Sequence, residues 1–125
     1  NRLDLFAEMR LASLLAKVTQ GDAAALPAAT VLRMATLGGA RAVGLDDRIG
    51  SLVPGKDADV VAVDFSSVAL APCYDPVSHL VHAAGREHVT DVWISVVAVV
   101  VRERLVRLDS AAITARAALW RDRIA

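Results

Sequence analysis

Residues 49–61 read Ile49-Gly50-Ser51-Leu52-Val53-Pro54-Gly55-Lys56-Asp57-Ala58-Asp59-Val60-Val61. At this stretch the spacing of apolar residues changes from a helical pattern to one typical of extended chain. Pro54 and Gly55 suit the two central positions of a type II turn, of which the second requires a positive φ. The β-branched run at 60–63 predicts a strand, which Asp64 closes. This stretch therefore marks the boundary between a helical N-terminal part of the chain and a part that contains β-strands.

The chain before this stretch has helical periodicity. We expect a first helix over residues 3–18, with a broad apolar face formed by Leu3, Phe6, Ala7, Leu11, Leu14, Leu15 and Val18. Asn1 can cap this helix, with Asp4 in the capping-box position, and Gly21 is suited to end it in the left-handed conformation. Further apolar residues lie on its other sides, namely Leu5, Met9, Ala12 and Ala16. The helix is therefore expected to lie between two layers.

A second helix is predicted over about 27–37, with Pro27 in its first turn. Gly38-Gly39 is expected to break it, and a further helical turn over 40–43 is expected to end at Gly44. The spacing of these glycines is not the G-x-G-x-x-G of a nucleotide-binding loop. We therefore expect these small residues to allow close backbone packing, and we do not expect this segment to bind a nucleotide phosphate.

Downstream of the first strand, residues 66–76 read as a loop and residues 77–84 as a short helix that ends at Gly85. Strands are predicted at 89–94, 96–101 and 105–106, and Arg102-Glu103-Arg104 reads as a solvated hairpin turn. Asp109 or Ser110 caps a last helix, whose apolar face is formed by Ile113, Ala117, Trp120 and Ile124. Because two or three strands make a marginal sheet, we expect residues 60–63 and 89–101 to share one sheet with strands from elsewhere.

Composition limits the class of protein. The chain has 125 residues, 55% of them apolar, and fourteen basic side chains balance fourteen acidic ones. The net charge of zero argues against a nucleic-acid binder, and the longest apolar run, Val96–Val101, is far too short to span a membrane. The single Cys73 excludes an internal disulfide and a Cys-rich zinc module. We expect one soluble, cytoplasmic, globular domain.

The start of the chain offers two interpretations. There is no initiator Met, the first helix begins almost at once, and only five residues are aromatic. The chain is either a trimmed small protein or, the interpretation that we favour, a piece of something larger.

Three histidines raise the possibility of a metal site. His79 and His82 are three residues apart, so a helix would place them on one face, and Cys73, Asp75 and His88 are near in sequence. Zinc requires three or four converging ligands, which this spacing permits but does not ensure. Histidines at the surface or in helix packing are the favoured alternative.

Two aspartates are candidates for an acid–base pair. Asp57 and Asp59 alternate at the start of a strand and could point the same way. Aspartates beside a turn more often accept hydrogen bonds from nearby backbone, and we favour that role. Cys73 has no setting that would lower its thiol pKa, so a nucleophilic role is not expected.

Two blocks resemble the C-terminal part of the amidohydrolase superfamily: Ala35-Thr36-Leu37-Gly38-Gly39-Ala40-Arg41-Ala42-Val43-Gly44-Leu45, followed by residues 49–61. The resemblance continues through Tyr74-Asp75-Pro76-Val77-Ser78, Ala84-Gly85-Arg86 and Val89-Thr90-Asp91-Val92-Trp93. Together these blocks are similar to the branch that contains methylthioadenosine/S-adenosylhomocysteine deaminases and triazine-type chlorohydrolases. The resemblance covers nearly the whole chain.

This resemblance implies an α/β fold: the C-terminal portion of a (β/α)8 barrel plus part of a small β-sandwich. Residues 1–47 would be the last barrel helices. Residues 48–108 would be sandwich strands with an inserted loop and short helix at 66–88, and residues 109–125 a C-terminal helix. In the family the turn between the strands at 89–94 and 96–101 usually contains glycine, whereas here it contains Ser95-Val96-Val97. Either the turn is rebuilt, or residues 94–101 form one longer strand.

The resemblance also implies a reaction. Such enzymes hold zinc or another divalent metal, which lowers the pKa of a bound water. This water attacks a purine-like or triazine ring and expels ammonia or, in a dechlorination, chloride. All the expected metal ligands lie upstream of Asn1, so no catalytic or metal-binding residue is assigned to this chain. Asn1, in the loop after the last ligand strand, is the one residue placed near the substrate. The alternative function is a non-catalytic interaction module. In both cases we expect a homo-oligomer or docking to the missing N-terminal part.

Overall fold

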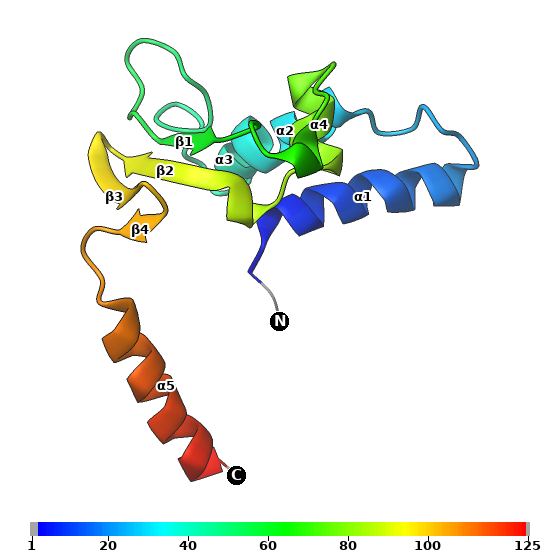
Figure 1. The fold of residues 1–125 in the computed structure, drawn as a ribbon. Coiled ribbons are helices and arrows are strands. Elements are labelled where there is room, and N and C mark those ends of the chain that lie inside the picture. Colours follow the sequence, from blue (N-terminus) through cyan, green and yellow to red (C-terminus); the bar gives the residue numbers. More distant parts are fainter. Residues whose placement is uncertain (1–2, 125) are drawn as a thin grey trace.

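A computed structural model describes residues 3–124 as a mixture of helices and strands (Figure 1). The helices, with π and 3-10 helices labelled η, are α1 (Leu5–Gln20), α2 (Ala28–Arg33), η1 (Met34–Gly38), α3 (Gly39–Ala42), η2 (Val68–Leu70), α4 (Pro76–His82), η3 (Arg86–His88) and α5 (Ser110–Ile124). The strands are β1 (Val60–Val63), β2 (Val89–Ile94), β3 (Val97–Val101) and β4 (Arg104–Leu105). Among the described residues, no helix is long and apolar enough to cross a membrane.

The four strands form one antiparallel sheet in the order β1-β2-β3-β4. Val61 lies opposite Val92 on the next strand, and Val100 lies opposite Leu105. The prediction that residues 60–63 and 89–101 share one sheet is therefore confirmed. The bounds of β1 and β2 match the prediction, while β3 starts one residue later than expected and β4 is shifted by one residue toward the N-terminus.

The hairpin between β2 and β3 keeps a two-residue turn, so the alternative of one long strand is wrong. Ser95 and Val96 both adopt positive φ, 47° and 63°, which is unfavourable for a β-branched residue. Hydrogen bonds to the segment before β1 hold them there. The Ser95 N–H donates to the Asp59 carboxylate over 2.8 Å, and the Val96 N–H donates to the Ala58 carbonyl over 3.3 Å.

The hairpin between β3 and β4 uses the same arrangement one strand further on. Arg102 and Glu103 have φ of 48° and 64°. Their N–H groups donate to the Asp91 carboxylate, over 3.1 Å, and to the Thr90 carbonyl, over 2.8 Å. The predicted hairpin turn is confirmed at Arg102 and Glu103, whereas Arg104, predicted to be part of it, belongs to β4. In both hairpins an aspartate and the residue before it replace the glycine that such turns usually need.

The first helix begins at a different residue from the one predicted. Asp4 is its N-cap, and the Asp4 carboxylate accepts a hydrogen bond from the Ala7 N–H over 3.3 Å. The expectation that Asn1 caps the helix is therefore wrong, because the extended backbone at Asp4 starts the helix later. Asn1 itself lies outside the described residues. Gly21 ends the helix with φ 63°, as predicted.

Gly38-Gly39 does not break the second helix. The chain passes from α2 through the π turn η1 into α3, and Gly39 has right-handed helical angles, φ −61° and ψ −45°. Glycine adopts helical angles as readily as left-handed ones, so the pair alone could not decide where the helix ends. The helical stretch ends at Ala42, one residue before the predicted end, with Val43 as its C-cap, and Gly44 follows with φ 70°.

The hydrophobic core is small and lies where three helices meet. Met9 of α1, Val31 of α2 and Val81 of α4 are buried together, with Phe6 and Leu32 packed against them. The sheet contributes no residue to this cluster. The core therefore joins the first helix to the middle of the chain.

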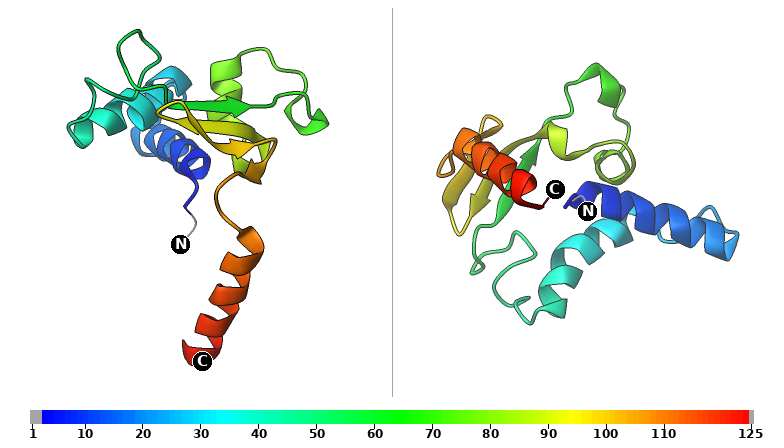
Figure 2. Two further views of the ribbon diagram at one scale, coloured as in Figure 1. Left: turned by 90° about the vertical axis from the view of Figure 1, so that its left-hand side faces the viewer. Right: turned by 90° about the horizontal axis from the view of Figure 1, so that it is seen from below.

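Helix α5 projects away from the rest of the chain (Figures 1 and 2). The expected last helix is present, and the Asp109 carboxylate caps it by accepting from the N–H groups of Ala111 and Ala112 over 2.9 and 3.0 Å. Every side chain that the structure describes between residues 101 and 124 is exposed. This helix has formed without a packing surface among residues 3–124.

Candidate functional site

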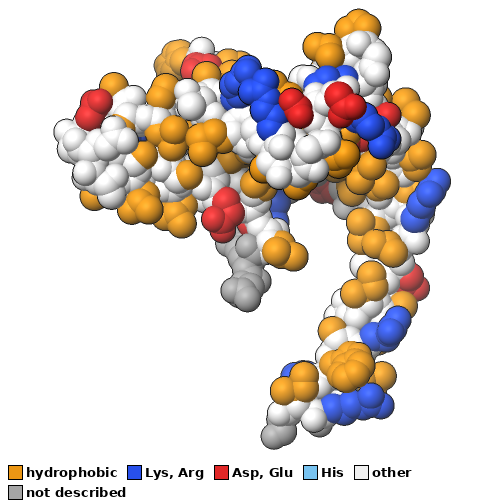
Figure 3. Space-filling view, turned by 180° about the vertical axis from the view of Figure 1, so that it is seen from behind, with side chains coloured by type: hydrophobic (Ala, Val, Ile, Leu, Met, Phe, Trp, Pro, Cys, Tyr) orange, Lys and Arg blue, Asp and Glu red, His pale blue; other side chains and the backbone are white. Residues whose placement is uncertain are grey.

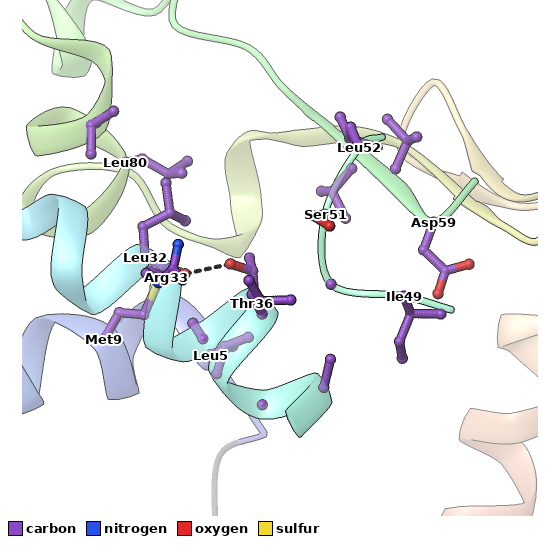
Figure 4. A pocket seen from close by; sticks show the side chains of 18 of the residues that line it. Leu5, Met9, Leu32, Arg33, Thr36, Ile49, Ser51, Leu52, Asp59 and Leu80 are labelled. Carbon is purple, nitrogen blue, oxygen red and sulfur yellow. Dashed lines mark hydrogen bonds between the residues drawn. The ribbon is translucent and has the colours of Figure 1, made fainter. Parts of the chain in front are cut away.

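An open apolar groove of about 910 Å³ lies between the helices and the sheet (Figure 4). Helix α1, the α2–α3 helical stretch, residues 49–52 and strand β1 form its walls. Leu5 and Met9 line it from α1, Leu32 from α2, and Ile49 and Leu52 from the loop. The groove thus separates the helices from the sheet, and its surface is mainly hydrophobic.

Two of the polar residues that line this groove, Thr36 and Asp59, form hydrogen bonds within the chain. The Thr36 hydroxyl donates to the Leu32 carbonyl one turn earlier, over 2.8 Å (Figure 4). The Asp59 carboxylate accepts the hydrogen bond from Ser95 described above. With these groups committed, the groove has the character of a surface for another layer of protein rather than of a catalytic pocket.

A second apolar surface covers the outer side of α1. Leu11, Leu14, Leu15 and Val18 are 49–79% exposed, although they are large hydrophobic residues. They lie on the side of the helix away from Met9 and Ser13, which are buried. The sequence prediction that this helix is apolar on more than one face is confirmed, and the second face has no cover among the described residues.

The Lys56 side chain of the Pro-Gly-Lys stretch ties a loop together. Its ammonium group donates to the carbonyls of Asp46 and Ile49, and the Ile49 contact is 3.2 Å long. Gly55 has φ 95°, as the predicted type II turn requires. This lysine therefore fixes residues 46–56 beside the start of β1.

The two aspartates of the same stretch also hold backbone and loops in place. Asp57 forms an ion pair with Arg48 over 2.8 Å, and Asp59 holds the Ser95 turn. Each carboxylate thus has its own partner, but the predicted bonds to nearby backbone are not what forms. Asp57 accepts from the Arg48 guanidinium, and Asp59 accepts from a backbone N–H that is distant in sequence. The sequence alone could not identify these partners, because they are nine and thirty-six residues away.

The three histidines have separate surroundings. The ring of His79 meets Phe65 edge-on, with centroids 6.3 Å apart. Nδ1 of His88 accepts a hydrogen bond from the Gly85 N–H over 3.0 Å. Within residues 3–124, no three His, Cys, Asp or Glu side chains lie close enough to hold a metal ion, and the Cys73 thiol is exposed. The described residues therefore do not fit a zinc site.

One carboxylate has a shifted pKa. The backbone N–H and the hydroxyl of Ser66 both donate to Asp64 over 2.8 Å, and these hydrogen bonds lower the pKa of Asp64 below its ordinary value of 3.8. Asp64 is fully exposed at the end of β1. Its role is to shape the turn that follows the strand.

Asn1, the one residue predicted to lie near a substrate, is outside the described residues, so this assignment stays a prediction. The geometry of residues 3–124 is that of a structural segment with two uncovered apolar surfaces.

The sequence model of the amidohydrolase family matches residues 1–99, which is most of the chain. This chain belongs to the amidohydrolase family. The 5-methylthioadenosine/S-adenosylhomocysteine deaminase of Teredinibacter turnerae is 44% identical to this amidohydrolase chain over 124 residues, 99% of the chain and 28% of the relative. The family resemblance inferred from the sequence blocks is thus confirmed.

Two solved structures extend the similarity to the fold. A zinc-bound adenosine deaminase from Xanthomonas campestris superimposes with a TM-score of 0.95 and 52% identity, over 96% of this chain and 27% of its own. Atrazine chlorohydrolase from Arthrobacter aurescens, in complex with zinc, superimposes with a TM-score of 0.84 and 28% identity, over 91% of this chain and 25% of its own. This amidohydrolase chain spans about a quarter of the length of the relatives it matches.

Proposed function

We propose that this chain is the C-terminal part of a longer metal-dependent hydrolase that releases ammonia from a purine-like ring of the adenosine type. The observation that carries the proposal is a match over nearly the whole chain to a 5-methylthioadenosine/S-adenosylhomocysteine deaminase and to an adenosine deaminase. Dechlorination of a triazine is the second candidate, since a chlorohydrolase shares the fold at the lower identity of 28%.

In this proposal the segment supports an active site that the rest of the protein builds. Helices α1, α2 and α3 are the last helices of a (β/α)8 barrel, the four strands are part of a small β-sandwich, and α5 is a C-terminal helix. The apolar groove and the outer face of α1 support this arrangement, because barrel helices pack against both the inner strands and each other.

Zinc or another divalent metal is the cofactor proposed for the longer protein, since related structures contain zinc. Because the described residues do not fit a metal site, we derive no catalytic step from them. Asn1 is proposed to lie near the substrate, on the basis of its place in the family pattern. The Asp4 cap supports this role, because it fixes the start of α1 three residues after Asn1.

The test compares the full-length protein with the 125-residue chain. The full-length protein should hold about one divalent metal ion per chain and release ammonia from methylthioadenosine, S-adenosylhomocysteine or adenosine. Elemental analysis and an ammonia-release assay measure the two properties. Chloride release from a chlorotriazine, without ammonia from any nucleoside, would favour the second candidate.

The 125-residue chain should hold no stoichiometric zinc and show no turnover. His79→Ala with His82→Ala is the matched variant, because these residues are the local histidine pair. Tightly held zinc in the chain that this double variant removes would contradict our placement of the metal site. Turnover by the chain itself would contradict the whole proposal.

A further inference from the structure

Helix α5 carries a narrow apolar stripe with no cover among the described residues. Ile113, Ala117, Trp120 and Ile124 are spaced by four, three and four residues, so they line one side of the helix. Ile113 is 49% exposed, Trp120 56% and Ile124 82%. Figure 3 shows hydrophobic side chains along this helix with arginines between them. A stripe of this width is typical of a helix that packs into a groove.

The C-terminal part of the chain has a positive charge that the rest lacks. Residues 102–125 hold six of the fourteen basic residues but three of the fourteen acidic ones. Arg116 and Arg123 flank the apolar stripe, and the Arg123 guanidinium lies 5.2 Å from the centre of the Trp120 ring. Two α5 helices from two copies would bring arginines against arginines. The charge therefore favours a partner surface with an acidic rim and disfavours self-pairing of α5.

A helix in the same position as α5 is present in the solved structure of a much longer protein. The adenosine deaminase from Xanthomonas campestris superimposes on 96% of this chain with a TM-score of 0.95, and the match covers 27% of that longer chain. At that coverage most of α5 must be included, since α5 is 15 of the 125 residues. A helix with all its described side chains exposed has no packing surface among residues 3–124. In the longer protein, the rest of the chain is therefore the surface available to hold it.

We propose that the stripe Ile113/Ala117/Trp120/Ile124 docks onto an apolar, acid-rimmed surface of the same polypeptide, in the part that lies outside residues 1–125. Trp120 is the central anchor, and the flanking arginines meet the acidic rim. This inference rests on the proposed function in one respect, that the natural protein is longer than this chain. It goes beyond that proposal by assigning α5 an occupied interface.

Tryptic cleavage of the full-length protein tests the docking. Arg107 lies in the linker before α5 and Arg116 lies within it, and a docked helix protects such sites. Trp120→Glu should release α5 and speed cleavage at these sites by at least about tenfold. The matched control is Ala115→Glu, which places the same charge on the opposite side of the helix and should leave the rate unchanged. Trp120→Phe should restore most of the protection.

The outcomes separate the possible occupants. Equal cleavage rates for wild type, Trp120→Glu and Ala115→Glu would overturn the proposal. Dissociation of a dimer by Trp120→Glu, with protection that rises with protein concentration, would overturn it in favour of a second copy. Protection in a monomer, lost in Trp120→Glu alone, supports docking within one polypeptide.

Ammonia release is measured separately from tryptic cleavage, so that the proposed function and the docking of α5 can fail independently. A full-length protein that releases no ammonia but protects α5 contradicts the proposed function and leaves the docking supported. A protein that is active, with α5 cleaved equally fast in all variants, contradicts the docking alone. Ammonia release by Trp120→Glu would further show that this variant is folded.

Discussion

Helices α1 and α5 are nearly equal in length, 16 and 15 residues, and an aspartate caps each of them. Yet Met9 and Ser13 of α1 are buried, while every described side chain of α5 is exposed. The difference shows that a cap and a helical period are enough to specify a helix, whereas the surface that covers its apolar side is specified elsewhere. In α5, and on the outer side of α1, that surface is not among residues 3–124.

The comparison is tested most strongly by truncating one large side chain on each side of α1. Met9→Ala should cost about 2–5 kcal/mol in free energy of unfolding, because it empties part of the buried cluster. Leu14→Ala should cost much less in the 125-residue chain, where Leu14 is 49% exposed. Denaturant unfolding measures both values.

If the outer side of α1 is covered in the full-length protein, Met9→Ala and Leu14→Ala should there lower the free energy of unfolding by similar amounts. Met9→Ala serves as the internal control, because Met9 is already buried in the 125-residue chain, at 6% exposure. A Leu14→Ala cost that stays small in the full-length protein would show that this face of α1 remains in contact with water.

Self-association of the 125-residue chain is the next largest effect expected. Leu11, Leu14, Leu15 and Val18 leave an apolar surface in water, and burial of such area drives association. Sedimentation at micromolar concentration should show oligomers or precipitation. Leu14→Lys with Leu15→Lys should shift the population toward monomer, and Thr19→Lys, an exposed polar position on the same helix, should not. A stable monomer of the unaltered chain would contradict this prediction.

The strands were the part of the fold best predicted from sequence. Val89–Ile94 is rich in β-branched and aromatic residues, and its bounds match the prediction because that local preference agrees with the final packing. The helix break predicted at Gly38-Gly39 is wrong, since glycine accepts both helical and left-handed angles. Asn1 and Asp4 are both good capping residues, so sequence alone did not decide between them.

The candidate site was less predictable than the fold. The family blocks identified the class of protein, but not what their residues do. Lys56 binds carbonyls at Asp46 and Ile49, and Asp59 binds the Ser95 backbone, contacts that exist only once the loop and the sheet have come together. The groove likewise forms only when α1, the α2–α3 helical stretch, residues 49–52 and β1 come together. Non-local contacts of this kind leave no periodic signal in the sequence.

The smallest expected effect comes from removing the two helix caps. Asp4→Ala should cost about 1 kcal/mol, because the Ala7 N–H loses its acceptor near the buried start of α1. The helix itself should persist, since its packing against α2 and α4 holds it in place. Circular dichroism of the 125-residue chain should therefore show nearly unchanged helix content, with a lower unfolding midpoint.

Asp109→Ala should lower the helix content and leave the unfolding midpoint unchanged, the reverse of the result expected for Asp4→Ala. Two N–H groups lose their acceptor at the start of α5, a helix with no packing energy from the described residues, and isolated helices of about 15 residues are marginal in water. Helix content should fall while the unfolding midpoint of the rest stays within experimental error. In the full-length protein the same substitution should lose much less helix, because the docked surface would then hold α5 in place. An equal loss of helix in both proteins would show that α5 has no packing surface there either, and α1 and α5 would differ in the whole protein as they do in this chain.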